Sequence, residues 1–269
     1  MRLAVHHASR ALSLVSGHPS VQAQRNLLLL MRAHALLELR NFASARTDVD
    51  VVLADVARRP DVATEAEALR ILGGLHHADG QQDMARVALV RAVDLLRHVE
   101  LPAALARTLR SRGYIELFNG SLSDAEWFFG EADSLYAELD DEAGRAWIEQ
   151  HRALAAFLSG DLEAARVRLT SVLQQMSALG DRNGVGWASG LLAFVAFYNR
   201  DFAEAARLAQ HVGEGASERG DDWAEAMMLT LQAHLAVWRG DLEGGLDKAE
   251  RARQRFRRLQ SPQGDQAIH

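Results

Sequence analysis

Cysteine is absent from this sequence of 269 residues, and proline occurs only four times. Without cysteine there is no disulfide framework and no thiolate metal site, which suits a reducing compartment. A bilayer-spanning helix needs about 20 apolar residues, whereas the most apolar stretch covers only residues 191–198. The N-terminus also lacks the apolar core of a signal peptide. These absences predict a cytoplasmic protein that does not enter a membrane.

A surplus of positive charge is also lacking. The chain has 30 Lys and Arg against 36 Asp and Glu, for a net charge of -6 and an isoelectric point of about 6.0. Proteins that bind nucleic acid usually carry a basic surface that attracts phosphates, so this balance argues against direct nucleic-acid binding. Hydrophobic residues make up 48% of the chain, which is typical of a folded protein and argues against disorder.

Motifs of catalysis and metal binding are missing as well. The chain has no Gly-x-x-x-x-Gly-Lys phosphate loop and no Gly-x-Ser-x-Gly nucleophile elbow. Histidine doublets occur at 6–7 and 76–77, but adjacent helical residues point about 100° apart and cannot easily share one ion. We therefore expect no catalytic residues, no enzymatic activity, no metal site and no cofactor.

The chain does contain a repeat with a constant stride of 40 residues. Positions 40, 80, 120, 160, 200 and 240 read Arg, Gly, Gly, Gly, Arg and Gly. Five places after each of these positions the chain reads Ala five times and then Gly, and no insertion interrupts the stride. Self-similarity at a fixed stride is the signature of a repeat architecture.

A second set of helix-breaking residues falls midway between these turns, so the chain is interrupted about every 20 residues. This set includes all the prolines: Pro19, Pro60, Pro102 and Pro262. The segments between breakers are rich in Ala, Leu, Arg and Glu, and their apolar residues recur at helical spacing, for example along residues 162–176. The pattern predicts thirteen amphipathic helices.

The residues at the turns have the chemistry that ends one helix and starts the next. Gly160 can adopt the left-handed conformation that closes a helix, and Asp161 can cap the helix that follows. Arg40 and Arg200 occupy the same closing position without the freedom of glycine. We therefore expect those two turns to be shaped differently.

Two columns of small residues recur at the same stride and predict close contacts between helices. One column comprises Ala45, Ala85, Ala125, Ala165, Ala205 and Gly245, and the other Ala33, Gly73, Gly113, Ala153, Ala193 and Ala233. A hairpin of two such helices cannot bury its apolar face alone, so we expect the hairpins to stack, each touching only its neighbours.

The last three repeats follow one pattern at the turn. It reads Gly160-Asp161-Leu162 with Ala165, Arg200-Asp201-Phe202 with Ala205, and Gly240-Asp241-Leu242, alongside the column Ala153, Ala193 and Ala233. This pattern resembles the tetratricopeptide-repeat (TPR) family, in the forty-residue form of large bacterial transcriptional regulators of the LuxR and maltose-activator kind. The resemblance covers about residues 21–260. It departs at Arg152 and Gln232, where the family has a large apolar residue, and at Gln82, which stands where Leu162 and Phe202 do.

The predicted fold is all-α, a right-handed alpha-alpha superhelix of six helical hairpins and one leading helix. The hairpins form a single repeat domain over residues 1–269, with units at 21–60, 61–100, 101–140, 141–180, 181–220 and 221–260. Residues 1–16 form a half repeat and 261–269 a tail that looks like the start of another repeat. We therefore expect the chain to be an excerpt of a longer array.

The resemblance also implies where a ligand would bind, because the first helix of each hairpin lines the concave wall in the family. Nine of the seventeen aromatic residues fall on that stripe, in the third to sixth units. The candidate binding residues are Arg110, Tyr114, Phe118, Trp147, Gln150, Phe157, Trp187, Phe194, Phe197, Tyr198, His234 and Trp238. An alternative interpretation is that these rings only pack between neighbouring repeats.

The predicted function is a protein-binding or peptide-binding scaffold, the regulatory segment of a larger bacterial signalling or transcriptional regulator. The partner would be a protein, a peptide or another domain of the same polypeptide. Two other hypotheses remain open: a domain that senses a small-molecule effector, and a structural scaffold for self-association. Arg251, Arg255 and Arg258 share one face of the last predicted helix, which suits either its dipole or an acidic partner.

Overall fold

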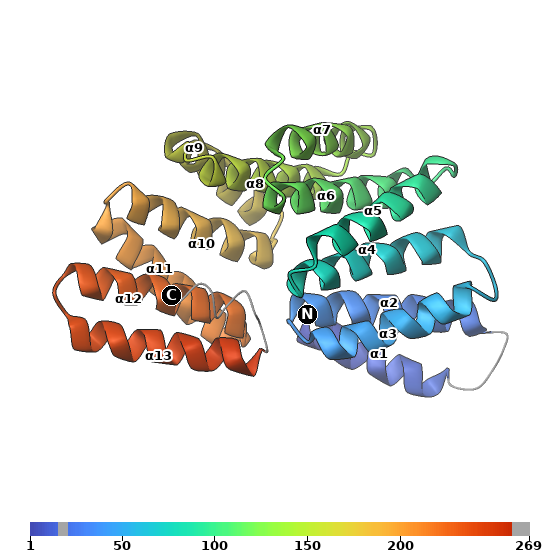
Figure 1. The fold of residues 1–269 in the computed structure, drawn as a ribbon, viewed down its shortest axis with the longest axis horizontal. Helices are drawn as coiled ribbons and strands as arrows, with labels where there is room; N and C mark the ends of the chain where they lie inside the picture. Colours follow the sequence, from blue (N-terminus) through green and yellow to red (C-terminus); the bar gives the residue numbers. More distant parts are fainter. Residues whose placement is uncertain (16–20, 260–269) are drawn as a thin grey trace. The chain divides into compact units, whose positions relative to one another are not determined.

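The computed structural model describes residues 1–15 and 21–259, and within them the chain forms thirteen α-helices and no strands (Figure 1). The helices are α1 (Arg2–Leu14), α2 (Gln22–Glu38), α3 (Phe42–Val56), α4 (Val62–Ala78), α5 (Gln82–Arg97), α6 (Pro102–Phe118), α7 (Leu122–Glu138), α8 (Glu142–Leu158), α9 (Leu162–Ala178), α10 (Arg182–Tyr198), α11 (Phe202–Arg219), α12 (Asp222–Trp238) and α13 (Leu242–Arg258). The predicted all-α repeat fold is confirmed. Pro19, Pro262 and the predicted tail lie outside the described residues.

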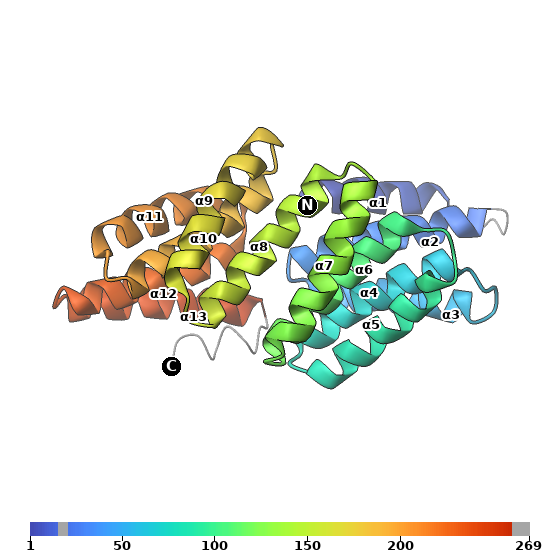
Figure 2. The same ribbon diagram turned by 90° about the horizontal axis from the view of Figure 1, so that it is seen from above.

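The contacts of the chain divide it into two compact units, Met1–Leu135 and Tyr136–His269. We call the even-numbered helices α2 to α12 the A helices, because each opens a hairpin, and the odd-numbered helices the B helices. Figures 1 and 2 show the hairpins stacked one after another within each unit. Successive A helices contact each other, α2 with α4 and α4 with α6, then α8 with α10 and α10 with α12. They line one side of each unit, which we call its A-helix face.

Aspartate caps start most of the helices, as the turn at Asp161 predicts. The Asp161 carboxylate accepts a hydrogen bond from the Ala164 N–H at 3.0 Å, which satisfies a backbone donor that the helix itself cannot pair. The same bond, to the residue three places on, is made by Asn41, Asp61, Asp141, Asp181, Asp201, Asp221 and Asp241.

The turns at Arg40 and Arg200 are not shaped differently from the glycine turns, and that expectation was wrong. Arg40 has a φ of 60° and Arg200 a φ of 62°, close to the 83° of Gly160, so all three close their A helix in the left-handed conformation. A side chain with a Cβ costs about 1–2 kcal/mol there. The stacking of the flanking helices therefore fixes the turn more strongly than the residue preference does.

The two columns of small residues lie at helix contacts, as predicted. Ala165 and the four alanines that precede or follow it in its column are fully buried. In the other column, a Cβ placed on Gly73 would lie 2.8 Å from Leu89, and one on Gly113 would lie 2.6 Å from Phe129. Because these distances leave no room for even a methyl group, the A and B helices of these hairpins approach as closely as their backbones allow.

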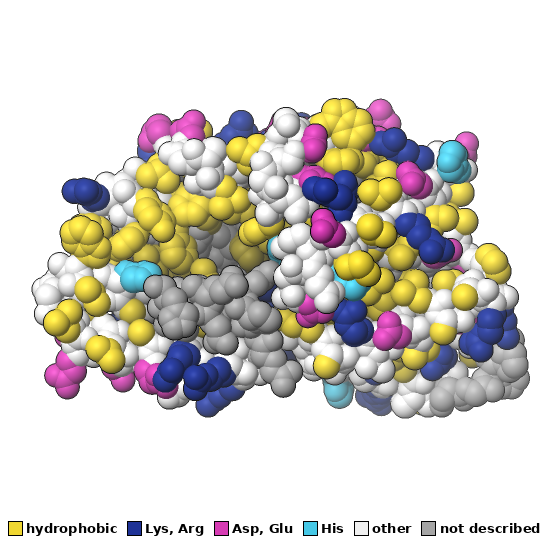
Figure 3. All heavy atoms as spheres, in the orientation of Figure 1, with side chains coloured by type: hydrophobic (Ala, Val, Ile, Leu, Met, Phe, Trp, Pro, Cys, Tyr) yellow, Lys and Arg dark blue, Asp and Glu magenta, His cyan; other side chains and the backbone are white. Residues whose placement is uncertain are grey.

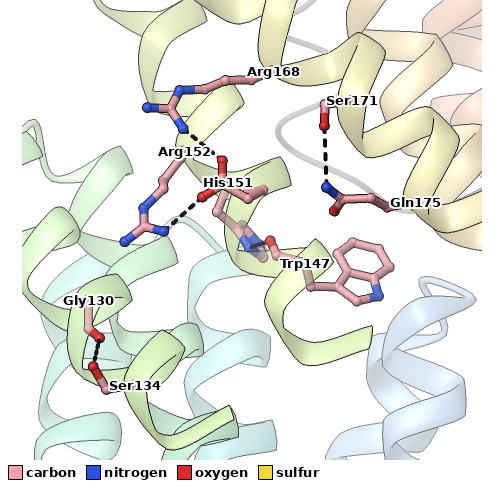
Figure 4. Close-up of polar contacts among 9 residues, drawn as sticks. Gly130, Ser134, Trp147, His151, Arg152, Arg168, Ser171 and Gln175 are labelled. Atoms are coloured by element: carbon pink, nitrogen blue, oxygen red, sulfur yellow. Dashed lines mark hydrogen bonds and ion pairs between the residues drawn. The ribbon is translucent and has the colours of Figure 1, made fainter. Parts of the chain in front are cut away.

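The departure from the family pattern at Arg152 is compensated by an ion pair. Arg152 donates to one Glu149 carboxylate oxygen at 2.8 Å, and Arg168 on α9 donates to the other at 2.7 Å. Figure 4 shows both arginines reaching toward this carboxylate from neighbouring helices. Arg152 is thus paired within α8, and the Glu149 carboxylate that it contacts joins α8 to α9 through Arg168.

A buried carboxylate joins helices in the N-terminal unit. Glu116 on α6 is 1% exposed, and its oxygens accept from Arg112 at 2.7 Å and from Arg86 on α5 at 2.9 Å. Arg112 also lies over the Phe128 ring of α7, 5.2 Å from its centroid. Glu116 therefore ties α5 to α6 and orients the guanidinium that contacts α7.

Replacing Ala165 with leucine should destabilise the protein by about 2 kcal/mol, because the contact between α8 and α9 has no space for a larger side chain. The free energy of unfolding in urea measures this effect. Ala178→Leu adds the same atoms at an exposed position of α9, so it should change stability by less than about 0.5 kcal/mol. Equal effects of the two substitutions would mean that the small column is not a close contact.

Glu116→Ala should cost about 3 kcal/mol of unfolding free energy, because it leaves the buried Arg112 without its carboxylate. Glu131→Ala is the control, since Glu131 pairs with the more exposed Arg97 and should cost no more than about 1 kcal/mol. Urea titrations of both variants test the difference. A loss at Glu116 as small as that at Glu131 would contradict the role of this carboxylate.

Candidate functional site

Aromatic side chains form a continuous row in the C-terminal unit. The ring of Phe157 on α8 lies 5.7 Å from that of Tyr198 on α10, and Tyr198 lies 5.5 Å from Phe197. The row continues from Phe197 to the imidazole of His234 on α12, at 6.0 Å. Ring centroids at these distances are in the range of favourable aromatic contacts. The row therefore joins three successive A helices.

Phe202, at the start of α11, extends the row toward the core between α10, α11 and α12. Its ring lies 5.7 Å from Phe197 and 5.3 Å from Trp238, the last residue of α12. We call Phe157, Phe197, Tyr198, Phe202, His234 and Trp238 the aromatic row. The stride of 40 places most of these residues in the final turn of their A helix, so the row follows one edge of the A-helix face.

The outer side of the aromatic row is open to solvent, whereas its inner side is core. Tyr198 is 59% exposed and Trp238 is 62% exposed. Phe197 and Phe202 are half-buried and pack against the core between α10, α11 and α12. Figure 3 shows hydrophobic side chains gathered over α10 on the same face. Some rings of the stripe therefore pack against the core, and others stand on the surface.

The other candidates in the C-terminal unit divide in the same way. Trp187 on α10 is 40% exposed, whereas Phe194 packs against the core. Trp147 donates from its indole Nε1 to Asp181 at 3.0 Å, and the other oxygen of that carboxylate caps α10. Trp147 therefore helps to fix the start of α10, and Figure 4 shows its indole directed away from Arg152. Gln150 is only 5% exposed, so the structure places it beneath the surface.

In the N-terminal unit, Tyr114 and Phe118 on α6 lie together with a residue that was not a candidate. The ring of His77 on α4 lies 5.4 Å from Tyr114 and 4.7 Å from Phe118, and the two aromatic rings are 5.0 Å apart. Burial raises the pKa of Tyr114. Burial also lowers the pKa of His77, although a hydrogen bond to Gln82 opposes that effect.

The contact between His77 and Gln82 explains why the second hairpin departs from the family pattern. The His77 Nδ1 lies 3.0 Å from the Gln82 Oε1, at the positions where Phe197 and Phe202 stack in the fifth hairpin. The two apolar residues are thus replaced together by a hydrogen-bonded polar pair. The hairpin of α4 and α5 forms in spite of the change.

A charged cluster occupies the A-helix face next to these rings. Arg70 on α4 makes two hydrogen bonds to the Glu67 carboxylate, at 2.7 and 2.9 Å, and lies 3.5 Å from the His34 ring of α2. Burial alone would raise the pKa of Glu67, but Arg70 outweighs it and holds that pKa below the usual value. Burial lowers the pKa of His34, and the positive charges of Arg70 and Arg110 lower it further.

The candidates therefore divide between the two units, and ring contacts join only some of them. Arg110, Tyr114 and Phe118 belong to the N-terminal unit, and the other nine belong to the C-terminal unit. The sequence reasoning missed His77, His34 and Phe202 as members of these groups. The signal for Phe202 was available, because an aromatic side chain directly after an A helix lies beside that helix's last turn.

One arginine of the basic face predicted for the last helix is already engaged within the protein and does not serve a partner. Arg255 donates to Asp222 at 2.9 Å and to Glu225 at 2.7 Å, so it holds α13 to α12. Elsewhere, the described residues contain no group of three His, Asp or Glu side chains that could hold a metal ion. No helix among them is long and apolar enough to cross a membrane.

Comparison with known proteins identifies the fold. No protein-family model matches the sequence, and no curated protein matches it either. Among solved structures, a Rap protein complexed with Competence and Sporulation Factor has a TM-score of 0.77 at 12% identity, covering 98% of this chain and 73% of that chain. The Rap conjugation gene regulator of plasmid pLS20, in complex with the Phr* peptide, has a TM-score of 0.67 at 14% identity, covering 91% and 78%.

A third similar structure is a signal transduction ATPase with numerous domains from Pyrococcus horikoshii, which has a tetratricopeptide repeat sensor. Its TM-score is 0.55 at 13% identity, and the match covers 86% of this chain but only 36% of that one. At these identities the likeness shows a TPR-like repeat fold and nothing further.

The lowered pKa values of His34 and His77 predict a loss of stability in acid. An unfolded histidine takes up a proton below a pH of about 6.5, whereas these two resist it in the folded state, so their contribution is complete above that pH and falls below it. Urea unfolding from pH 7.5 to 5.0 measures the slope. The double variant His34→Gln/His77→Gln should show a shallower slope, and the exposed control His98→Gln should not. Identical slopes for all three proteins would contradict the prediction.

Proposed function

We propose that this protein binds a peptide, or an extended segment of a partner protein, along the A-helix face of its C-terminal unit. The observation that supports this proposal is the aromatic row, which combines a packed inner side with exposed rings at Tyr198 and Trp238. Exposed aromatic side chains on a rigid support are the residues that most often dominate binding energy at protein interfaces.

The spacing of the hairpins suits an extended ligand. Packed helices lie about 8–10 Å apart, and an extended peptide rises about 3.3 Å per residue, so every third ligand residue would meet the next A helix. The A helices α8, α10 and α12 each contribute a ring to the row. A ligand of about seven residues would thus span it.

A compact small molecule fits this surface less well. Pockets for such ligands usually enclose most of the ligand, whereas Tyr198 and Trp238 stand on an open surface. The two similar Rap structures hold Competence and Sporulation Factor and the Phr* peptide, respectively. The complex with the Phr* peptide supports a peptide ligand for this chain by analogy of fold.

We further propose that the chain acts by binding, without catalysis of its own, as the regulatory segment of a larger bacterial signalling or transcriptional regulator in the cytoplasm. The similar ATPase from Pyrococcus horikoshii supports this context, because its tetratricopeptide repeats are a sensor. The partner would be a protein, a peptide or another domain of the same polypeptide.

Selection from a library of random peptides displayed on phage tests the proposal. Peptides that bind the immobilised protein should lose at least about tenfold in affinity on the double variant Tyr198→Ala/Trp238→Ala, because the rings form the contact. Trp127→Ala is the matched control, since Trp127 is 57% exposed but lies on the B helix α7. Affinities come from fluorescence anisotropy of labelled peptides. Selected peptides that bind the double variant as well as the unchanged protein would refute this site.

A further inference from the structure

A second surface lies at the far side of the last hairpin, where α12 and α13 form a groove of about 190 Å³. It is lined by Thr230, Ala233, His234, Val237, Leu242, Gly245, Leu246 and Ala249. Leu242 is 63% exposed and Leu246 is 73% exposed, and because they lie four residues apart on α13 they form one apolar patch and not two scattered residues. No described helix covers this groove.

Each residue of the groove has a counterpart 40 residues earlier, on α10 and α11. The counterparts are Gly190, Ala193, Phe194, Phe197, Phe202, Ala205, Ala206 and Ala209. All but Gly190 belong to, or pack against, the core cluster that α12 completes with Met228, Leu231 and Leu235. Gly190 also faces α12, because a Cβ placed on it would lie 3.7 Å from the Met228 Cε. The groove therefore corresponds to the surface of α10 and α11 on which α12 packs. We call the surface of a hairpin that receives the next A helix its seat.

Two other hairpins receive the next A helix in the same way. Ala68, Ile71 and Leu75 of α4 complete the core on α2 and α3. Ala188 and Val195 of α10 complete the core on α8 and α9. Each seat described here receives an amphipathic A helix, so the groove on α12 and α13 continues an established series of interfaces.

The arginines of α13 add a second requirement for the helix that would bind in this groove. Gly213 of α11 faces the N-terminal half of α12, because a Cβ there would lie 3.5 Å from the Met228 Cβ, and its counterpart on α13 is Arg253. Arg257 and Arg258 follow on the same helix and are exposed. Arg253 is paired with Glu250 on the same helix, so the surplus positive charge near the first turns of a helix in this seat comes from Arg257 and Arg258. Acidic residues there would be favoured both by these arginines and by the helix dipole.

We propose that the groove on α12 and α13 docks an amphipathic helix of a partner protein. This helix has apolar residues at the spacing of Met228, Leu231 and Leu235 and acidic residues in its first turns. The apolar stripe would cover Leu242 and Leu246, and the acidic end would lie beside Arg253. The groove shares His234 with the aromatic row, but Leu242 and Leu246 are not part of that row, so substitutions there test the groove independently of the peptide-binding function proposed for the row.

A synthetic peptide with the sequence of residues 221–240 is a suitable probe, because it carries this apolar spacing together with Asp222 and Glu225 in its first turn. Fluorescence anisotropy of the labelled peptide, titrated with the full chain, measures binding. We expect saturable binding that Leu246→Glu weakens at least about tenfold, since it places a charge in the apolar seat. Val167→Glu is the matched control: Val167 is 55% exposed on the B helix α9, so affinity should stay within about twofold.

A second peptide, with Asp222→Lys and Glu225→Lys, tests the charge requirement and should bind about tenfold more weakly at low salt. Circular dichroism of Leu246→Glu should match that of the unchanged protein, because the side chain is exposed. Absence of saturable binding, or equal effects at Leu246 and Val167, would overturn the proposal. A molecular mass that rises with protein concentration, and no longer rises in Leu246→Glu, would also overturn the proposal, because it would assign the groove to a second copy of this chain. Tenfold tighter binding after removal of residues 260–269 would assign it to this chain and likewise overturn the proposal.

Discussion

A helical hairpin of this chain cannot bury its apolar face alone, and within each unit the first helix of the next hairpin covers that face. That constraint accounts for the constant stride of 40 residues, because an insertion would shift the next helix out of its seat. It also accounts for the small columns, since helices joined by short turns must approach closely where Ala165 and Gly113 lie. The left-handed turn at Arg200 follows from the same constraint: stacking outweighs the preference of the residue.

The surfaces that stacking leaves uncovered are the ones with binding potential. Along the A-helix face of the C-terminal unit, Phe197 and Phe202 serve the core while Tyr198 and Trp238 remain exposed beside them. At the last hairpin, Leu242 and Leu246 repeat positions that are covered 40 residues earlier. Binding surfaces of both kinds arise from the same architecture, because a stack of amphipathic hairpins always has an inner edge and an end.

Two departures from the repeat pattern, at Gln82 and Arg152, are compensated locally. Gln82 replaces an apolar residue at the turn, and His77 changes with it to form a hydrogen bond. Arg152 replaces another, and Glu149 joins it to α9. A polar group that is partly removed from water is costly without a partner, and both of these replacements have one within reach. Repeats can therefore differ in side-chain chemistry while their backbones remain alike. The A-helix face of the N-terminal unit is charged at Glu67, and that of the C-terminal unit is aromatic at Phe157.

The sequence by itself determined the helices and their order, because breakers, aspartate caps and apolar spacing act within a few residues of one another. It also determined which positions face a neighbouring helix, since one column such as Ala165 repeats at a fixed stride. Only the tertiary structure decided which candidate side chains are available to a ligand. Gln150 lies buried, Trp147 bonds to Asp181 and His77 joins Tyr114, all through contacts with another helix. Helical spacing gives the direction of a side chain, whereas its exposure depends on what the adjacent hairpin places against it.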